Sequence, residues 1–183
     1  MTKKIKEFRN TVLVEDIPED GLHLIFEDIP GLLSGIEECR IQGPAKGEVS
    51  LHRVDGDVNL KGRVAALIVF KCDRCLEEYS NKIDASFFYE FLPSQLVDKE
   101  KEIALSSEDM EVSLYDGVEI QIGEIFREQI LLQIPMRHVC SEDCKGICPG
   151  CGVDLNREKC RCQQKETLEN PFSVLKKLRE AAK

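Results

Sequence analysis

Eight of the nine cysteines in this chain lie in four close pairs, and this arrangement constrains the fold more than any other feature of the sequence. The pairs are Cys72/Cys75, Cys140/Cys144, Cys148/Cys151 and Cys160/Cys162, which leaves Cys39 alone. A structural zinc ion takes four cysteine ligands with short spacings along the chain, so two ions would use all eight sulfurs. The sequence therefore predicts two zinc ions as cofactors, with the eight paired cysteines as ligands.

The sequence CPGCG at residues 148–152 is typical of a zinc knuckle, a tight turn that places two sulfurs on one side. Pro149 fixes one backbone dihedral, and the two glycines tolerate the left-handed conformations that such turns require. Cys160 and Cys162 follow about one short hairpin later and complete a four-sulfur site, although CxC is a less usual spacing for ligands than CxxC.

The two remaining pairs then form the second site, in which a metal joins segments about 65 residues apart and closes a long loop. An alternative grouping places Cys140, Cys144, Cys148 and Cys151 around one ion. We prefer the long-range grouping because it accounts for both outlying pairs. Disulfides, a redox-active dithiol at Cys72/Cys75, and zinc with no role beyond folding are the competing interpretations.

Composition describes a folded protein of one domain, or one domain with an appended module, because 42% of the 183 residues are hydrophobic and 32% are charged. No apolar run has the length of a secretory signal or a membrane span, so we expect a cytoplasmic location, where thiols stay reduced and clustered cysteines bind metal. The net charge of −9 argues against non-specific coating of nucleic acid. Residues 135–183 nevertheless carry ten Lys or Arg and seven Asp or Glu.

Two long segments of alternating hydrophobicity flank Cys72-Asp73-Arg74-Cys75. Even positions from Val58 to Phe70 are mostly apolar, and odd positions from Tyr79 to Phe91 continue the pattern. The alternation predicts an antiparallel hairpin whose turn carries two thiols. A preceding strand over residues 48–54 ends at the turn dipeptide Asp55-Gly56.

The remaining sequence predicts shorter elements. We expect a short helix near residues 33–39, a hairpin or turn at Asp116-Gly117, and a helix over residues 123–133 that ends before Pro135. Asn170-Pro171 is typical of the start of a C-terminal helix. The fold class is therefore α+β: a mainly antiparallel β-sheet, with closure into a barrel left open, a packed helix, a Cys-rich zinc module and a C-terminal helix.

The same pattern predicts two units, a β-rich domain over residues 1–134 and a Cys-rich zinc module with the C-terminal helix over residues 135–183. A shared metal site would dock the second on the first. No catalytic motif is present, and zinc sites with four cysteine ligands leave no open position for catalysis, so we expect no enzyme.

The order of these motifs resembles a known family. CDRC between two strands, a helix ending LLQIP, then CSEDCKGICPGCGVDLN and NPFSVLKKL, over about residues 60–180, resemble the bacterial YceD family of large ribosomal RNA subunit accumulation proteins. The resemblance implies a role in synthesis, processing or accumulation of 23S ribosomal RNA. It also implies that the zinc site formed by the later cysteines, which include Cys148 and Cys151, is an accessory stabiliser, because some members lack these cysteines.

Two hypotheses follow about partners. In the first, the protein contacts large-subunit RNA precursor, ribosomal proteins, or both. Its candidate RNA-binding residues are Lys145, Arg157, Lys159, Arg161, Lys176, Lys177 and Arg179. In the second, an acidic, zinc-stabilised adaptor binds a basic partner such as a ribosomal protein without contacting RNA. Neither hypothesis involves a membrane or a small-molecule substrate.

Overall fold

The computed structural model describes residues 2–5, 8–94, 112–160 and 162, and for residues 2–5 it describes the backbone alone. The C-terminal helix expected after Asn170 lies outside the described residues. The elements, in chain order, are β1 (Thr2–Ile5), β2 (Val12–Leu13), the 3-10 turn η1 (Val14–Asp16), β3 (Leu22–Phe26), β4 (Cys39–Ile41), β5 (Lys46–Val54), β6 (Asp57–Lys71), β7 (Glu78–Pro93), β8 (Val112–Tyr115), β9 (Glu119–Ile120) and α1 (Ile122–Gln133).

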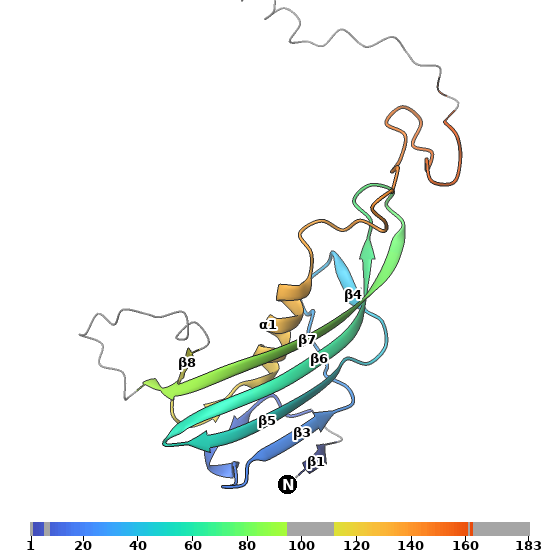
Figure 1. Cartoon of the computed structure of the whole chain (residues 1–183). Helices are drawn as coiled ribbons and strands as arrows, with labels where there is room; N and C mark the ends of the chain where they lie inside the picture. The colour runs from blue at the N-terminus through green and yellow to red at the C-terminus, as the bar shows by residue number, and fades with distance from the viewer. Residues whose placement is uncertain (1, 6–7, 95–111, 161, 163–183) are drawn as a thin grey trace, which may run out of the picture.

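A seven-stranded sheet forms the body of the molecule (Figure 1). Its strand order is β1-β3-β5-β6-β7-β8, and β4 pairs with the part of β6 that extends beyond β5. The inner strands are antiparallel, whereas β1 and β8 at the two ends lie parallel to their neighbours. The sheet is open rather than closed into a barrel, and the α+β class with a mainly antiparallel sheet is confirmed.

The long hairpin of β6 and β7 has the register that the alternating pattern predicts. Pairs run from Val58↔Phe91 to Lys71↔Glu78, so the hairpin tip consists of residues 72–77. Val58, Leu60 and Val64 are fully buried on one face of β6, while odd-numbered side chains point to the other face. The hairpin therefore carries the CDRC sequence away from the body of the sheet.

Helix α1 covers the buried face of this sheet (Figure 1). Its apolar stripe of Ile122, Phe126 and Ile130 is fully buried. The Phe126 ring lies edge-on to Phe26 and Phe87, with ring centroids 5.8 and 5.9 Å apart. A Cβ atom on Gly47 would come within 2.8 Å of the Phe126 ring, so a strand position without a side chain lets the helix approach closely.

One local expectation is wrong, and another is met only in its turn alternative. Residues 33–35 form a turn, residues 36–38 are irregular and Cys39 begins β4, so no helix forms over residues 33–39. Gly31 and Gly35 adopt positive φ values of 74° and 81°, which are incompatible with an α-helix. A bend at Asp116-Gly117 connects β8 to β9, but these two strands do not pair with each other as a hairpin. They pair with separate partners, β8 with β7 and β9 with β2.

Candidate metal centres

The tip of the β6–β7 hairpin holds the first pair of thiols in a tight turn. The N–H of Leu76 donates to the carbonyl of Cys72 at 2.9 Å, and the N–H of Cys72 donates to the carbonyl of Glu77 at 2.9 Å. Leu76 adopts a φ of +64°, which a tight turn of this kind requires. The side chains of Cys72 and Cys75 are buried, at 0% and 6% exposure.

Backbone hydrogen bonds attach residues 138–147 to this hairpin tip. The N–H of Asp73 donates to the carbonyl of His138, and the N–H of His138 donates to Oδ2 of Asp73, both at 2.7 Å. The N–H of Ile147 donates to the carbonyl of Arg74 at 3.0 Å, and Nη1 of Arg74 donates to the carbonyl of Cys144 at 2.9 Å. Two residues of the CDRC turn thus hold a segment that lies about 65 residues further along the chain.

This attachment brings four sulfurs together in what we call the hairpin cluster: Cys72, Cys75, Cys140 and Cys144. All four Sγ atoms lie within 4.8 Å of one another. The Sγ atoms of Cys72 and Cys144 are 3.8 Å apart, and those of Cys75 and Cys140 are 3.7 Å apart. Four sulfurs at about 2.3 Å from a tetrahedral zinc ion would be about 3.8 Å from one another, so the spacing fits zinc.

The other four sulfurs form what we call the module cluster: Cys148, Cys151, Cys160 and Cys162. They also lie within 4.8 Å of one another. Within the knuckle, the N–H of Gly152 donates to the carbonyl of Cys148 at 2.8 Å, and Gly152 adopts a φ of +75°. The Sγ atoms of Cys151 and Cys160 are 3.7 Å apart, while Cys148 and Cys160 are closer, at 3.2 Å. Cys148 is buried, whereas Cys151 and Cys162 are exposed.

In the hairpin cluster, the environment lowers the pKa of one thiol and raises the pKa of another. Burial alone would raise the pKa of Cys72, but backbone N–H groups that donate to its sulfur lower that pKa to about 6. Two of these donors are Arg74, at 3.4 Å, and Cys140, at 3.5 Å. The N–H of Glu77 favours a thiolate at Cys75, but burial and the neighbouring sulfurs raise the pKa of Cys75 to about 12. A divalent cation would remove this opposition between like charges.

In the module cluster, too, the pKa of one thiol is lowered and that of another is raised. The Cys160 thiol, followed by the N–H groups of Gly150 and Cys151, lowers the pKa of Cys148 to about 6. Nearby Cys151 and Cys160 raise the pKa of Cys162 to about 12. Because the donor set, the sulfur spacing and the N–H···S bonds all suit a soft divalent ion, both clusters fit zinc.

The structure gathers the sulfurs in the long-range grouping rather than in the alternative that joins Cys140, Cys144, Cys148 and Cys151. All nine cysteines are free thiols, and Cys39 is buried in the main core. The identification of the eight thiols as metal ligands stays a prediction, as does the division into two domains near residue 134.

The candidate RNA-binding residues are placed only in part. Lys145, Arg157 and Lys159 are described, whereas Arg161, Lys176, Lys177 and Arg179 lie outside the described residues. Arg157 forms ion pairs with Glu77 at 3.1 Å and with Asp154 at 3.5 Å. Its guanidinium thus joins the module to the hairpin tip and is partly neutralised there.

Sequence reasoning missed the residues that support the clusters. Asp73 and Arg74 are the intervening residues of the CDRC turn, and they hold the second half of the site through the bonds described above. Asn156 accepts from the N–H of Lys145 at 2.7 Å, and its Nδ2 lies 3.5 Å from the sulfur of Cys144. The only sequence signal for these three residues was their position close to the cysteines. Their hydrogen-bond partners lie elsewhere along the chain and could not be identified from local spacing.

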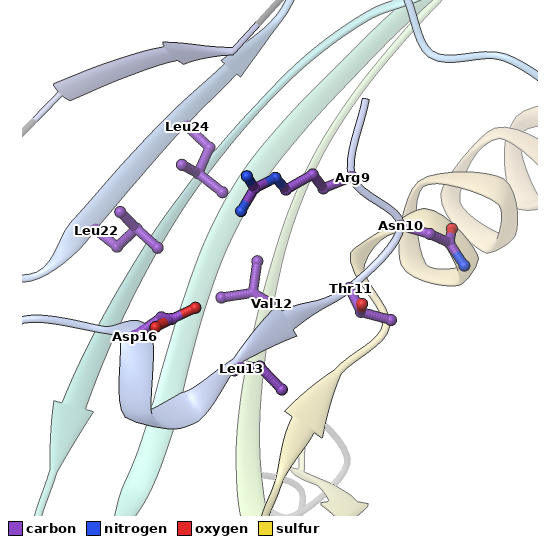
Figure 2. A pocket seen from close by; sticks show the side chains of 8 residues that line it. All are labelled: Arg9, Asn10, Thr11, Val12, Leu13, Asp16, Leu22 and Leu24. Carbon is purple, nitrogen blue, oxygen red and sulfur yellow. The ribbon is translucent and has the colours of Figure 1, made fainter. Parts of the chain in front are cut away.

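A cavity of about 510 Å³ lies between residues 9–16 and β3 (Figure 2). Figure 2 shows the Arg9 side chain extending toward β3, between the aliphatic side chains of Leu24 and Val12. The described residues that line it include Thr11 and Asp16 but no histidine, cysteine or lysine. None of the helices in the described part of the chain has the length and apolar character needed to span a bilayer.

Comparison with known proteins gives a family match. The model of the family described as large ribosomal RNA subunit accumulation protein YceD matches residues 60–179, more than half of the chain. A chloroplastic large ribosomal RNA subunit accumulation protein YCED homolog 1 of Arabidopsis thaliana is 28% identical over 159 residues, covering 75% of this chain and 49% of that protein.

The corresponding homolog of Zea mays is 27% identical over 144 residues, covering 66% of this chain and 49% of the maize protein. An uncharacterised protein of Mycobacterium tuberculosis is 29% identical over 139 residues, covering 75% of this chain and 58% of that protein. The chain thus spans about half the length of the curated relatives it matches. No solved structure matches the chain.

Proposed function

The chain belongs to the YceD family, and from this premise we propose that it is a non-enzymatic, cytoplasmic factor for biogenesis of the large ribosomal subunit. It supports synthesis, processing or accumulation of 23S ribosomal RNA. The observation that carries the proposal is the family match over residues 60–179, which includes the long hairpin, α1 and both cysteine clusters.

Zinc in the two clusters has a structural role in this proposal. Four protein sulfurs around each ion leave no coordination position for a substrate or an activated water. When bound, zinc supplies a cross-link between chain segments. The ion in the hairpin cluster would join the tip of β6–β7 to residues 140–144, and the hydrogen bonds of Asp73 and Arg74 orient the two halves toward each other.

Direct contact with RNA is the first form of the proposal. Lys145 and Lys159 on the module, with Arg157, would face phosphate groups, and Arg161, Lys176, Lys177 and Arg179 would add to them. Because Arg157 already forms ion pairs with Glu77 and Asp154, it would contribute less to RNA binding than the two lysines. The adaptor without RNA contact is the second form, and the net charge of −9 favours it.

The proposed function is tested by deletion of the gene and measurement of 23S ribosomal RNA relative to 16S, with sedimentation of the protein against large-subunit precursors. We expect a loss of 23S RNA that the intact gene restores. Unchanged 23S levels together with no co-sedimentation would contradict the proposal.

The two forms are separated by charge reversal at Lys145, Lys159, Lys176 and Lys177. If RNA is contacted through this surface, the affinity for precursor RNA falls and its dependence on salt becomes shallower, because fewer counterions are released. Reversal of four exposed lysines on the sheet, Lys46, Lys61, Lys71 and Lys82, changes the net charge by the same amount and is the matched control. Equal RNA binding by both sets of variants would exclude this surface.

A further inference from the structure

A groove lined by acidic and apolar side chains lies between β8, β9 and the exposed flank of α1. Its volume is about 350 Å³. We call it the acidic groove and define it by four carboxylates, Asp116, Glu119, Glu124 and Glu128, around a floor that includes Phe91 and Ile125. Phe91 and Ile125 are each 7% exposed, so the floor is continuous with the core of the sheet.

The acidic groove carries charge of one sign. Among the described residues that line it there is no lysine, arginine or histidine. No ion pair with a described cation involves Glu119, Glu124 or Glu128. Clefts lined by one sign of charge above low-dielectric walls concentrate the electric field and attract ligands of the opposite sign.

The polar groups at the rim are held in place by neighbouring residues. The side chain of Asp116 accepts hydrogen bonds from the N–H groups of Val118 at 2.8 Å and Glu119 at 3.1 Å, which keep the pKa of its carboxyl below the ordinary value. On the opposite rim, the hydroxyl of Tyr89 donates to Glu128 at 3.2 Å and accepts from Gln129 at 2.7 Å. Both rims therefore present oriented carboxylates.

Exposed aliphatic side chains lie beside these carboxylates. Leu114, which lines the groove, is 57% exposed, and Leu132 is 67% exposed. Glu124 and Glu128 also line a second hollow on α1 together with Arg127, Leu131 and Leu132. The guanidinium of Arg127 is already engaged, because it donates to the carbonyls of Leu32 and Ser34 at 3.4 and 3.0 Å.

We propose that the acidic groove binds a basic polypeptide segment of a partner protein, one that carries Lys or Arg beside an apolar side chain. Charge complementarity selects this occupant: cationic side chains would meet the carboxylates while the apolar side chain covers Leu114 and the floor. RNA phosphates would instead be repelled. The inference rests on the proposed function and specifies the chemistry of the protein partner. A basic protein of the large subunit would have this chemistry.

The test is the affinity of the zinc-loaded full chain for three labelled probes, measured by fluorescence anisotropy. The probes are a short peptide of Lys, Arg and Leu, the same peptide with every Lys and Arg replaced by Gln, and a single-stranded RNA. We expect the basic peptide to bind and its Gln counterpart not to bind. Glu124→Lys with Glu128→Lys should weaken the binding of the basic peptide about tenfold or more and should not weaken the binding of the RNA. Glu124→Gln with Glu128→Gln should weaken it less.

Glu37→Lys with Glu38→Lys is the matched control, because it changes the net charge equally at two exposed residues of a loop. Equal affinity of the groove and control variants for the basic peptide would overturn the proposal, as would preferential binding of the RNA through Glu124 and Glu128. Thermal unfolding confirms that each variant is folded. A deletion strain with normal 23S RNA, together with no co-sedimentation of the protein, would overturn the proposed function but would leave the peptide result to decide the groove separately.

Discussion

At the scale of single residues, the closest contacts between the module and the hairpin leave no space for a side chain. Gly146 adopts a φ of +72°, and a Cβ atom there would lie 2.8 Å from the carbonyl oxygen of Arg74. Gly152 adopts a similar φ of +75°, but a Cβ atom there would meet nothing within 4 Å. Substitution of Gly152 therefore measures the cost of a left-handed backbone alone, whereas substitution of Gly146 adds the cost of a steric clash.

We predict that Gly152→Ala lowers the free energy of unfolding by about 1–2 kcal/mol, the cost of a left-handed residue with a side chain. Gly146→Ala should lower it by a clearly larger amount and reduce zinc retention, because the backbone of Arg74 must move. Chemical denaturation and metal analysis of the two variants provide the measurement. Equal losses in the two variants would show that the contact with Arg74 is unimportant.

A second prediction at this scale concerns pH. Asp84 accepts two hydrogen bonds from Arg63, at 2.6 and 2.7 Å, and this guanidinium holds the pKa of the Asp84 carboxyl below its ordinary value of 3.8. The stabilisation is present above the ordinary pKa and is lost as the pH falls through the lower pKa of the folded state. In Arg63→Met, NMR titration should show the pKa of Asp84 rising. An unchanged pKa would contradict the pairing.

At the scale of elements, the two cysteine clusters differ in burial and in the length of chain they close. The hairpin cluster buries Cys72, Cys75 and Cys144, at 6% exposure or less. Its partners Cys75 and Cys140 are 65 residues apart, whereas Cys151 and Cys160 in the module cluster are 9 apart. From loop length alone, closing the longer segment contributes about 2 kcal/mol more.

We therefore predict that the purified, reduced protein holds two zinc ions that leave at different rates. A chelating dye should remove the ion of the module cluster first, because Cys151 and Cys162 are exposed. Cys148→Ser with Cys151→Ser should retain one ion and most of the stability, while Cys72→Ser with Cys75→Ser should lose more stability. One ion in the unaltered protein, or release of both ions in a single phase, would contradict this.

At the scale of the whole molecule, the sheet and the hairpin cluster have distinct cores that meet at Tyr79. The main core contains residues from the strands β2 to β9 and from α1, while Cys72, Cys75 and Cys144 form a second cluster with Val139, and Tyr79 packs against both. Because the main core contains none of the eight clustered cysteines, loss of zinc should disorder one part of the protein and spare the other.

Hydrogen exchange after zinc removal tests this prediction. We expect amides in β5, β6 and β7 near the sheet to stay protected, while protection is lost at the tip of the hairpin and at residues 138–160. Restored zinc should restore the protection. Loss of protection throughout β5 and β6 would show that the sheet and the metal centres fold as one cooperative unit.

The sequence by itself determined the local features: the alternation that makes β6 and β7 a hairpin, the helical stripe of Ile122, Phe126 and Ile130, and the close cysteine pairs. Each depends on residues a few positions apart, so its period or spacing can be read directly. The tertiary structure alone decided the parallel pairing of β8 with β7, the open sheet, and which pairs of cysteines share a cluster. It also assembled the acidic groove from β7, β8, β9 and α1. These features depend on contacts between segments that are distant along the chain, and periodicity or spacing does not specify such contacts. The sequence could favour the long-range cysteine grouping because it used all eight paired thiols, but only the structure decided against the alternative.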